Sequence, residues 1–239
     1  MSKIVLLGGS SEIGTKVAEV LLKNKSEYSE IHYVSTSLST SDSIWRWSPT
    51  GFKDVDNIFS EINLKKGDLV IISLGYLGEP YSLENLDYSL HEIEKIFNTN
   101  FQIPLMSMLR ASVDLAKVGG GKIMVMTSSA AYPVLNTNLF YGNAKLSLDQ
   151  IALRMAKVFS KNNVELTLVR SGFVPTKLNL DRKPTPFSRS ADEVALIVLK
   201  NFDSKVIWTP KFFKWISLAL TYIPPLRYLA SRKVTESWK

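Results

Sequence analysis

The chain contains no cysteine and only two histidines, His32 and His91. The lack of cysteine excludes disulfide bonds, thiolate zinc sites and cysteine nucleophiles, and it is typical of proteins in a reducing compartment. Two histidines are few for a His-based metal site, and they lie far apart in the sequence. We therefore expect no bound metal and a structural role for both histidines.

Long uncharged apolar runs are also missing. No stretch of about 18 such residues occurs, so no membrane-spanning helix is expected. The first strand-like run starts at residue 4, and no signal peptide is expected before it. These absences predict a cytoplasmic protein.

The rest of the composition is ordinary for one globular domain. The chain has 239 residues, of which 45% are apolar and 21% are charged, enough to bury a full core. The net charge of +7 is compatible with anionic lipid, with nucleic acid, or with a basic surface that binds neither. No nucleic-acid-binding motif is present, so nucleic acid is not expected as a partner.

Strand-like and helix-like segments alternate along the chain. Strands are expected at 4–7, 31–34, 69–72, 122–127, 164–169 and 206–208, and helices at 12–22, 86–118, 141–160 and 191–200. Residues 35–43 are expected to form a loop. This alternation predicts an α/β fold, a doubly wound parallel sheet of the Rossmann type, whose ligands bind at the carboxyl ends of the strands. We expect one domain over 1–209 and a separate tail over 210–239.

A glycine turn follows the first expected strand, in Gly8-Gly9-Ser10-Ser11-Glu12-Ile13-Gly14. Gly8 and Gly14 allow a tight strand-to-helix turn and the close approach of a pyrophosphate, toward which the first N–H groups of the helix point. Glu12 stands where the usual motif has its middle glycine. An ordinary turn between strand and helix remains the alternative interpretation.

Tyr141 and Lys145 are one helical turn apart, at the start of an apolar helical pattern. A nearby ammonium group favours tyrosinate, so Lys145 is expected to lower the pKa of Tyr141 and make it a proton donor to a ketone. The alternative is an exposed pair without chemistry. The pair follows a strand-like run that ends in Thr127-Ser128-Ser129, which favours the catalytic interpretation.

Over nearly its whole length the sequence resembles the short-chain dehydrogenase/reductase family. The resemblance implies an NAD(P)H-dependent ketone reductase with Asn100, Ser129, Tyr141 and Lys145 as catalytic residues. Aligning from the strand selects Ser129 as the catalytic serine, whereas the usual spacing back from Tyr141 selects Ser128. The implied cofactor-binding residues are Gly8, Ser10, Ser11, Ile13, Gly14, Asp54, Val55, Gly75, Tyr141, Lys145, Val174 and Thr176.

Two segments depart from the family pattern. Ser171 replaces the proline of the Pro-Gly segment that holds the nicotinamide carboxamide, and Ile72-Ser73-Leu74-Gly75 stands for the usual Asn-Asn-Ala-Gly. The end of the second strand, Ser35-Thr36-Ser37, has neither the acid typical of NAD-binding folds nor a base. Arg46 is the nearest base. Resemblance alone favours NADH over NADPH.

Within the family, residues 7–14, 74–78 and 206–213 resemble reductases that act on a decaprenylphosphoryl 2-keto pentose. This closer resemblance implies a polyprenyl-linked sugar substrate, a role in making the arabinose donor of cell-wall arabinan, a partner oxidase subunit and a homo-oligomer. Two alternatives stay open: a reductase of another ketone, and a non-catalytic NAD(P)-binding sensor.

The tail from Lys205 to Lys239 combines seven basic residues with one acid, and aromatic residues lie between them. Such a composition is typical of a segment that lies on anionic lipid. A helix packed on the core or on a partner subunit is the alternative. The first interpretation predicts peripheral contact at the inner face of the membrane.

Overall fold

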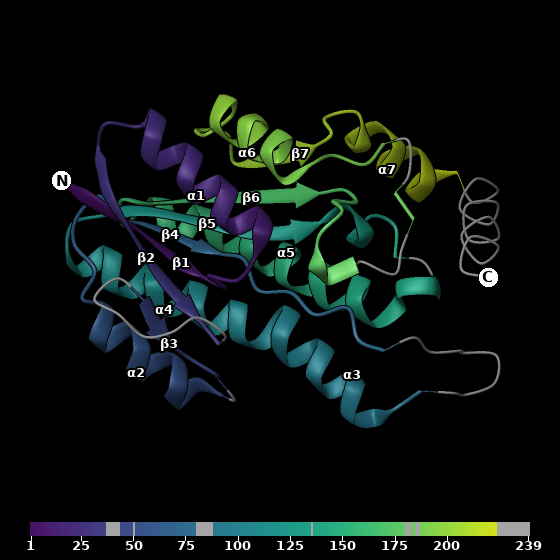
Figure 1. Ribbon diagram of the computed structural model, residues 1–239, viewed down its shortest axis with the longest axis horizontal. Helices are drawn as coiled ribbons and strands as arrows, with labels where there is room; N and C mark the ends of the chain where they lie inside the picture. Colours follow the sequence, from purple (N-terminus) through teal and green to yellow (C-terminus); the bar gives the residue numbers. More distant parts are fainter. Residues whose placement is uncertain are drawn as a thin grey trace.

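The computed structural model describes residues 1–36, 44–49, 51–79, 88–134, 136–179, 183–184 and 187–223. These residues form a seven-stranded parallel sheet with the strand order β3-β2-β1-β4-β5-β6-β7 (Figure 1). The strands are β1 (Ser2–Leu7), β2 (Tyr28–Ser35), β3 (Ile44–Arg46), β4 (Leu69–Ile72), β5 (Gly121–Ser128), β6 (Val164–Ser171) and β7 (Val206–Thr209). The expected doubly wound α/β fold is confirmed.

Helices cover both faces of the sheet. In Figure 1, α1 and α6 lie together on one face, and α2, α4 and α5 lie on the other. The helices are α1 (Glu12–Asn24), α2 (Phe52–Ile62), α3 (Leu90–Phe97), α4 (Ile103–Lys117), α5 (Leu139–Ser160), α6 (Ala191–Lys200) and α7 (Phe213–Tyr222).

The apolar strands divide the core between the two faces. Ile4 and Leu6 of β1 belong to the cluster under α1 and α6, whereas Val5 and Leu7 belong to the cluster on the opposite face. Successive side chains of a strand point to opposite faces, so a strand between two helical layers must be apolar throughout. This requirement explains the uninterrupted apolar run of β1.

Residues 86–87 of the helix expected over 86–118 lie outside the described ranges, and the rest of it is divided in the structure. α3 ends at Phe97, a π-helical turn spans Asn98–Gln102, and α4 starts at Ile103. Pro104 occupies the first turn of α4. Within an uninterrupted α-helix its missing N–H would remove one backbone hydrogen bond, whereas in the first turn of a helix it removes none. The division places Asn100 in the irregular turn, and Pro104 is the sequence signal for it.

Two elements between β2 and β4 were not expected. β3 is an edge strand of three residues that pairs only with β2, and α2 begins at Phe52. The loop predicted over 35–43 begins one residue too early, because Ser35 is the last residue of β2. Residues 37–43 lie outside the described ranges.

Part of the expected tail is ordered as α7. Phe213 packs so closely on Gly172 that a Cβ on this glycine would lie 2.5 Å from the phenyl ring. The tail therefore contacts the segment after β6 directly. Across the described ranges, none of the helices combines the length and the apolar character that crossing a membrane requires.

Candidate active site

The glycine turn after β1 lies against the end of β4. Gly8 adopts a left-handed backbone with φ +92°, and an added Cβ would lie 2.5 Å from the carbonyl oxygen of Ser73. A Cβ at Gly14 would lie 2.7 Å from the Cβ of Ser73. Ser11 caps α1, because its Oγ accepts the N–H of Gly14 at 3.2 Å, and its hydroxyl is hydrogen-bonded to that of Ser73 at 2.7 Å. The turn thus has the backbone geometry that a diphosphate needs at a helix N-terminus.

Glu12 has a contact that a glycine could not make. Its Oε1 accepts the backbone N–H of Lys177 at 2.8 Å, which joins the glycine turn to the segment after β6. Ser10 and Glu12 line a cavity of about 510 Å³ together with Pro175. The half-buried side chain of Ile13 packs on the core cluster under α1 and α6, so it is engaged in packing.

An asparagine that the sequence analysis missed, Asn179, forms two hydrogen bonds within the segment after β6. Asn179 Oδ1 accepts the N–H of Thr176 at 2.9 Å, and Asn179 Nδ2 donates to the carbonyl oxygen of Val174 at 3.0 Å. The side chain of Val174 is buried and that of Thr176 is half-buried. The two predicted nicotinamide contacts therefore belong to one hydrogen-bonded turn.

The segment after β4 is held by two of the predicted catalytic side chains. Lys145 Nζ donates to the carbonyl oxygen of Leu74 at 2.8 Å. Asn100 Nδ2 donates to the carbonyl oxygen of Tyr76 at 2.6 Å, and its Oδ1 accepts the Tyr76 N–H at 3.2 Å. Gly75 lies between these contacts, and a Cβ there would be 3.8 Å from Asn100 Oδ1. The structure thus brings Asn100, Lys145 and Gly75 together.

Lys145 is a buried cation on α5. Its burial lowers the pKa of the ammonium group to about 8, because the charged form is poorly solvated there. Its Nζ lies 5.9 Å from the ring centroid of Tyr141, one turn earlier on the same helix. The tyrosine and the charge expected to act on it are therefore neighbours.

The two candidate serines differ in what their hydroxyls do. Ser128 is the last residue of β5, is buried, and accepts the N–H of Ala130 at 3.1 Å. Ser129 begins the 3₁₀ turn Ser129–Ala131 and is half-buried. The oxygen of the Ser128 hydroxyl is thus engaged in its own turn, and Ser129 stays the predicted catalytic serine.

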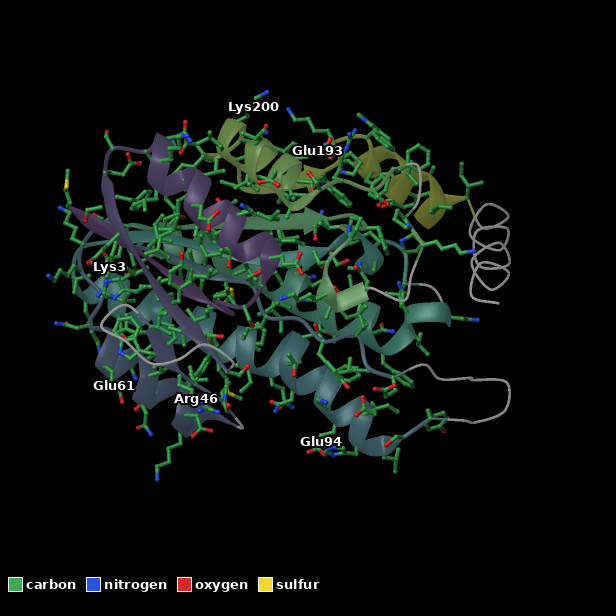
Figure 2. All side chains as sticks on the ribbon, in the orientation of Figure 1. Lys3, Arg46, Glu61, Glu94, Glu193 and Lys200 are labelled. Carbon is green, nitrogen blue, oxygen red and sulfur yellow. The ribbon has the colours of Figure 1, made fainter. Side chains whose placement is uncertain are left out.

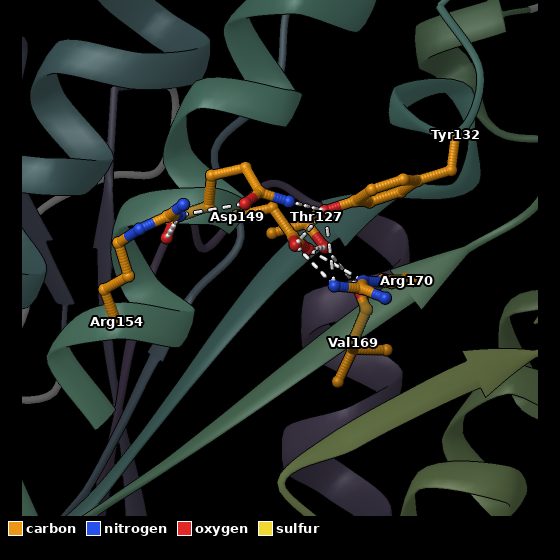
Figure 3. Close-up of polar contacts among 7 residues, drawn as sticks. Thr127, Tyr132, Asp149, Arg154, Val169 and Arg170 are labelled. Atoms are coloured by element: carbon orange, nitrogen blue, oxygen red, sulfur yellow. Dashed lines mark hydrogen bonds and ion pairs between the residues drawn. The ribbon is translucent and has the colours of Figure 1, made fainter. Parts of the chain in front are cut away.

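A buried ion pair lies behind this site (Figure 3). Arg170 of β6 donates to both carboxylate oxygens of Asp149 on α5, at 2.9 and 2.6 Å. The same carboxylate accepts the hydroxyl of Thr127 at 2.9 Å and that of Tyr132 at 2.6 Å. Burial raises the pKa of Tyr132 to about 12. The network joins β5, β6 and the turn after Ser129 to the helix that carries Tyr141 and Lys145.

The edge of the sheet beside the glycine turn is formed by β2 and β3. Ser35 pairs in register with Arg46, so the only arginine expected near the adenosine 2′ position stands beside the carboxyl end of β2. Ser35 is buried and Arg46 is exposed at the sheet edge (Figure 2). The sequence analysis had left the position of Arg46 open.

Asp54 and Val55 remain predicted cofactor contacts, and the structure places both of them in α2. This valine is fully buried in the core cluster, and its N–H is bonded to the carbonyl oxygen of Gly51. Asp54 lies in the first turn of α2, where its carbonyl oxygen accepts the indole N–H of Trp47 at 3.1 Å. Since β3 ends at Arg46, the residues that follow this strand are Trp47 and Ser48, not the Asp-Val pair.

Known proteins resemble this chain in sequence and in fold. Residues 12–200 match the family described as enoyl-(acyl carrier protein) reductase. An uncharacterized oxidoreductase of Mycobacterium tuberculosis strain H37Rv is 28% identical over 158 residues, which are 64% of this chain and 61% of that protein. The counterpart in strain CDC 1551 is 29% identical over 159 residues, with the same coverage. The chain thus spans less than two thirds of the length of these relatives.

Two solved structures show the same fold at low sequence identity. A short-chain dehydrogenase from Burkholderia cenocepacia in complex with NADP has a TM-score of 0.80 at 15% identity, covering 96% of this chain and 97% of that one. A short-chain dehydrogenase from Sphingobium yanoikuyae in complex with NADPH has a TM-score of 0.74 at 14% identity, covering 95% and 96%. Since the family match covers well over half of the sequence, the chain belongs to the short-chain dehydrogenase/reductase family.

Proposed function

We propose that the protein reduces a ketone with NADPH, with Tyr141 as the proton donor. The observation that carries this proposal is the position of Lys145. It is buried, bonded to the carbonyl oxygen of Leu74, and one helical turn from Tyr141. Ser129 follows β5, whose backbone carbonyl at Met126 is within 3.4 Å of the same ammonium group.

The residues of the candidate active site fit a dinucleotide. Gly8 and Gly14 allow the glycine turn to pack directly on Ser73, where added Cβ atoms would clash. In the proposal, this turn holds the diphosphate together with Ser10 and Ser11. Lys145 holds the nicotinamide ribose, Gly75 lies beside it, and Val174 and Thr176 hold the nicotinamide. When bound, the cofactor supplies the hydride.

Side chains of the protein donate the proton to the carbonyl oxygen and stabilise the negative charge that develops on it. Tyr141 gives its hydroxyl proton to that oxygen, and the Lys145 ammonium stabilises the tyrosinate that remains. The Ser129 hydroxyl donates a hydrogen bond to the same oxygen, where negative charge develops. Asn100 acts indirectly, because it fixes the segment after β4 against which Lys145 is held.

Arg46 supports NADPH as the coenzyme. It is the residue in register with Ser35 at the end of β2, and an arginine near this position accommodates a 2′-phosphate. The two solved structures described above are complexes with NADP and NADPH. The earlier expectation of NADH rested on resemblance alone and finds no support in these observations.

The substrate in this proposal is a polyprenyl-linked 2-keto pentose. Three segments resemble reductases of that substrate, and each includes or follows the carboxyl end of a strand, β1, β4 or β7. The glycine turn contacts Ser73 at the head of 74–78, and 206–213 contacts Gly172 through Thr209 and Phe213.

NADPH oxidation by the purified full-length protein tests the proposal. The substrate is a polyprenylphosphoryl 2-keto pentose, and the matched control is the same keto sugar without its lipid. Turnover of the lipid-linked ketone, with reduction at C2 shown by mass spectrometry, would support the whole proposal. Turnover of other ketones alone would keep the reductase and reject this substrate. NADPH binding without turnover of any ketone would indicate a sensor.

A further inference from the structure

α7 has an inverted distribution of polarity. It buries Ser217, which is 6% exposed, whereas Trp215 is 69% and Tyr222 is 77% exposed. The other exposed apolar side chains of this helix and its ends are Phe212, Ile216, Leu218 and Ile223. A helix of a globular protein normally turns its apolar stripe toward the core. Here the outward surface of the helix is apolar and aromatic.

The same region is basic. The sequence from residue 204 to residue 235 contains no aspartate or glutamate, and Lys211 and Lys214 are exposed at the start of α7. The Nζ of Lys214 lies 5.5 Å from the ring centroid of Trp215. Basic side chains beside exposed aromatic ones match the chemistry of an anionic bilayer surface, which offers negative headgroups above an apolar interior.

This surface adjoins the candidate active site. Phe187, which is half exposed, packs on Phe212 and Phe213 with ring centroids 5.3 and 6.4 Å away. Phe213 packs on Gly172, at the start of the segment after β6 that carries Val174 and Thr176. α7 and Phe187 therefore form one apolar surface whose inner side contacts a wall of the candidate active site.

We propose that this surface, defined by Phe187, Phe212, Trp215, Leu218, Tyr222 and Ile223, is a docking site for an anionic phospholipid bilayer. The aromatic and aliphatic side chains enter the headgroup region, and Lys211 and Lys214 bind lipid phosphates. None of the described helices is long and apolar enough to cross the bilayer. The proposal goes beyond the reductase function and does not depend on the identity of the ketone. It places the mouth of the site next to the membrane surface.

Vesicle flotation without substrate tests it. The probes are vesicles of phosphatidylcholine alone and vesicles that also contain phosphatidylglycerol. We expect the wild-type protein to float with the anionic vesicles at low salt and to be released at high salt. Trp215→Ser is expected to weaken binding about tenfold or more, because the serine lacks the large apolar surface that Trp215 would remove from water in the bilayer. Lys211→Gln with Lys214→Gln is expected to weaken it about 30-fold.

Val113→Ser is the matched control, because Val113 is an exposed apolar side chain of α4, on the opposite face of the sheet. It should float like the wild type. Absence of wild-type flotation at low salt would overturn the proposal. So would equal flotation of Trp215→Ser. A self-association that Trp215→Ser abolishes, seen by sedimentation in the absence of flotation, would assign the surface to a second copy. If the wild type does not float and Trp215→Ser has a lower melting temperature, this surface packs against another part of the same chain.

Discussion

The ammonium group of Lys145 donates a hydrogen bond to the carbonyl oxygen of Leu74 at 2.8 Å, across 71 residues of sequence. This contact fixes a buried cation between α5 and the segment after β4. The cation is one turn from Tyr141, so the same contact sets where positive charge acts on the proposed proton donor.

The burial of Lys145 predicts a pH-dependent stability. Its pKa in the folded protein, about 8, is below the ordinary value of 10.5. Between these two values the unfolded chain binds more protons, so the free energy of unfolding rises with pH in this window. Lys145→Met lacks this contribution. The stability of the wild type relative to Lys145→Met should increase by up to about 3 kcal/mol from about pH 8 to about pH 10.5.

Urea unfolding of both proteins across this pH range measures the difference. Every other titrating group is common to the two proteins, so the comparison isolates Lys145. Parallel pH profiles would show that the ammonium group is solvated well enough to keep its ordinary pKa.

Arg46 should decide the choice of coenzyme. Arg46→Gln removes a charge-assisted hydrogen bond to the 2′-phosphate, and such bonds contribute about 1.5–3 kcal/mol. We expect kcat/KM for NADPH to fall about 10- to 150-fold, with the value for NADH unchanged. Arg154→Gln, a change of an arginine that is bonded only within α5 among the described residues, is the control and should leave both values as they are. Equal losses with both coenzymes would refute the assignment.

The buried pair of Asp149 and Arg170 should be a large contributor to stability once one partner is removed. Asp149→Asn leaves the Arg170 guanidinium without its counter-charge in a buried position, which costs about 3–5 kcal/mol. Glu19→Gln breaks the exposed pair with Lys16 and should leave the stability nearly unchanged, because solvent screens such a pair. Urea denaturation measures both. An Asp149→Asn protein as stable as Glu19→Gln would mean that solvent or another group compensates Arg170.

Elements with strong local signals were predicted well from the sequence. The strand over 69–72 and the helix over 191–200 have the expected bounds. The strand is a continuous apolar run, and the helix begins with a capping box between Ser190 and Glu193. β3 was missed because a three-residue edge strand has almost no local signal. α2 was missed because the Asp-Val letters within it suggested a family motif instead.

The sequence predicted which residues form the site better than it predicted the contacts between them. The glycine turn, Asn100, Tyr141 and Lys145 could be found from motifs that are local in sequence. The bond from Lys145 to Leu74, the register of Arg46 with Ser35 and the contact of Glu12 with Lys177 join residues far apart or on separate strands. Such pairings follow from the packing of the whole sheet, so no local pattern could predict them.

The rate of ketone reduction by Tyr141→Phe tests the central claim most directly. Tyr132→Phe is the matched control, because it also removes one phenolic hydroxyl near Ser129, but one that is bonded to Asp149. In single-turnover reactions with saturating NADPH, we expect Tyr141→Phe to be slower by about 10²- to 10⁴-fold with NADPH affinity nearly unchanged, and Tyr132→Phe to be much closer to the wild type. A Tyr141→Phe protein that reduces the ketone at the wild-type rate would contradict the account.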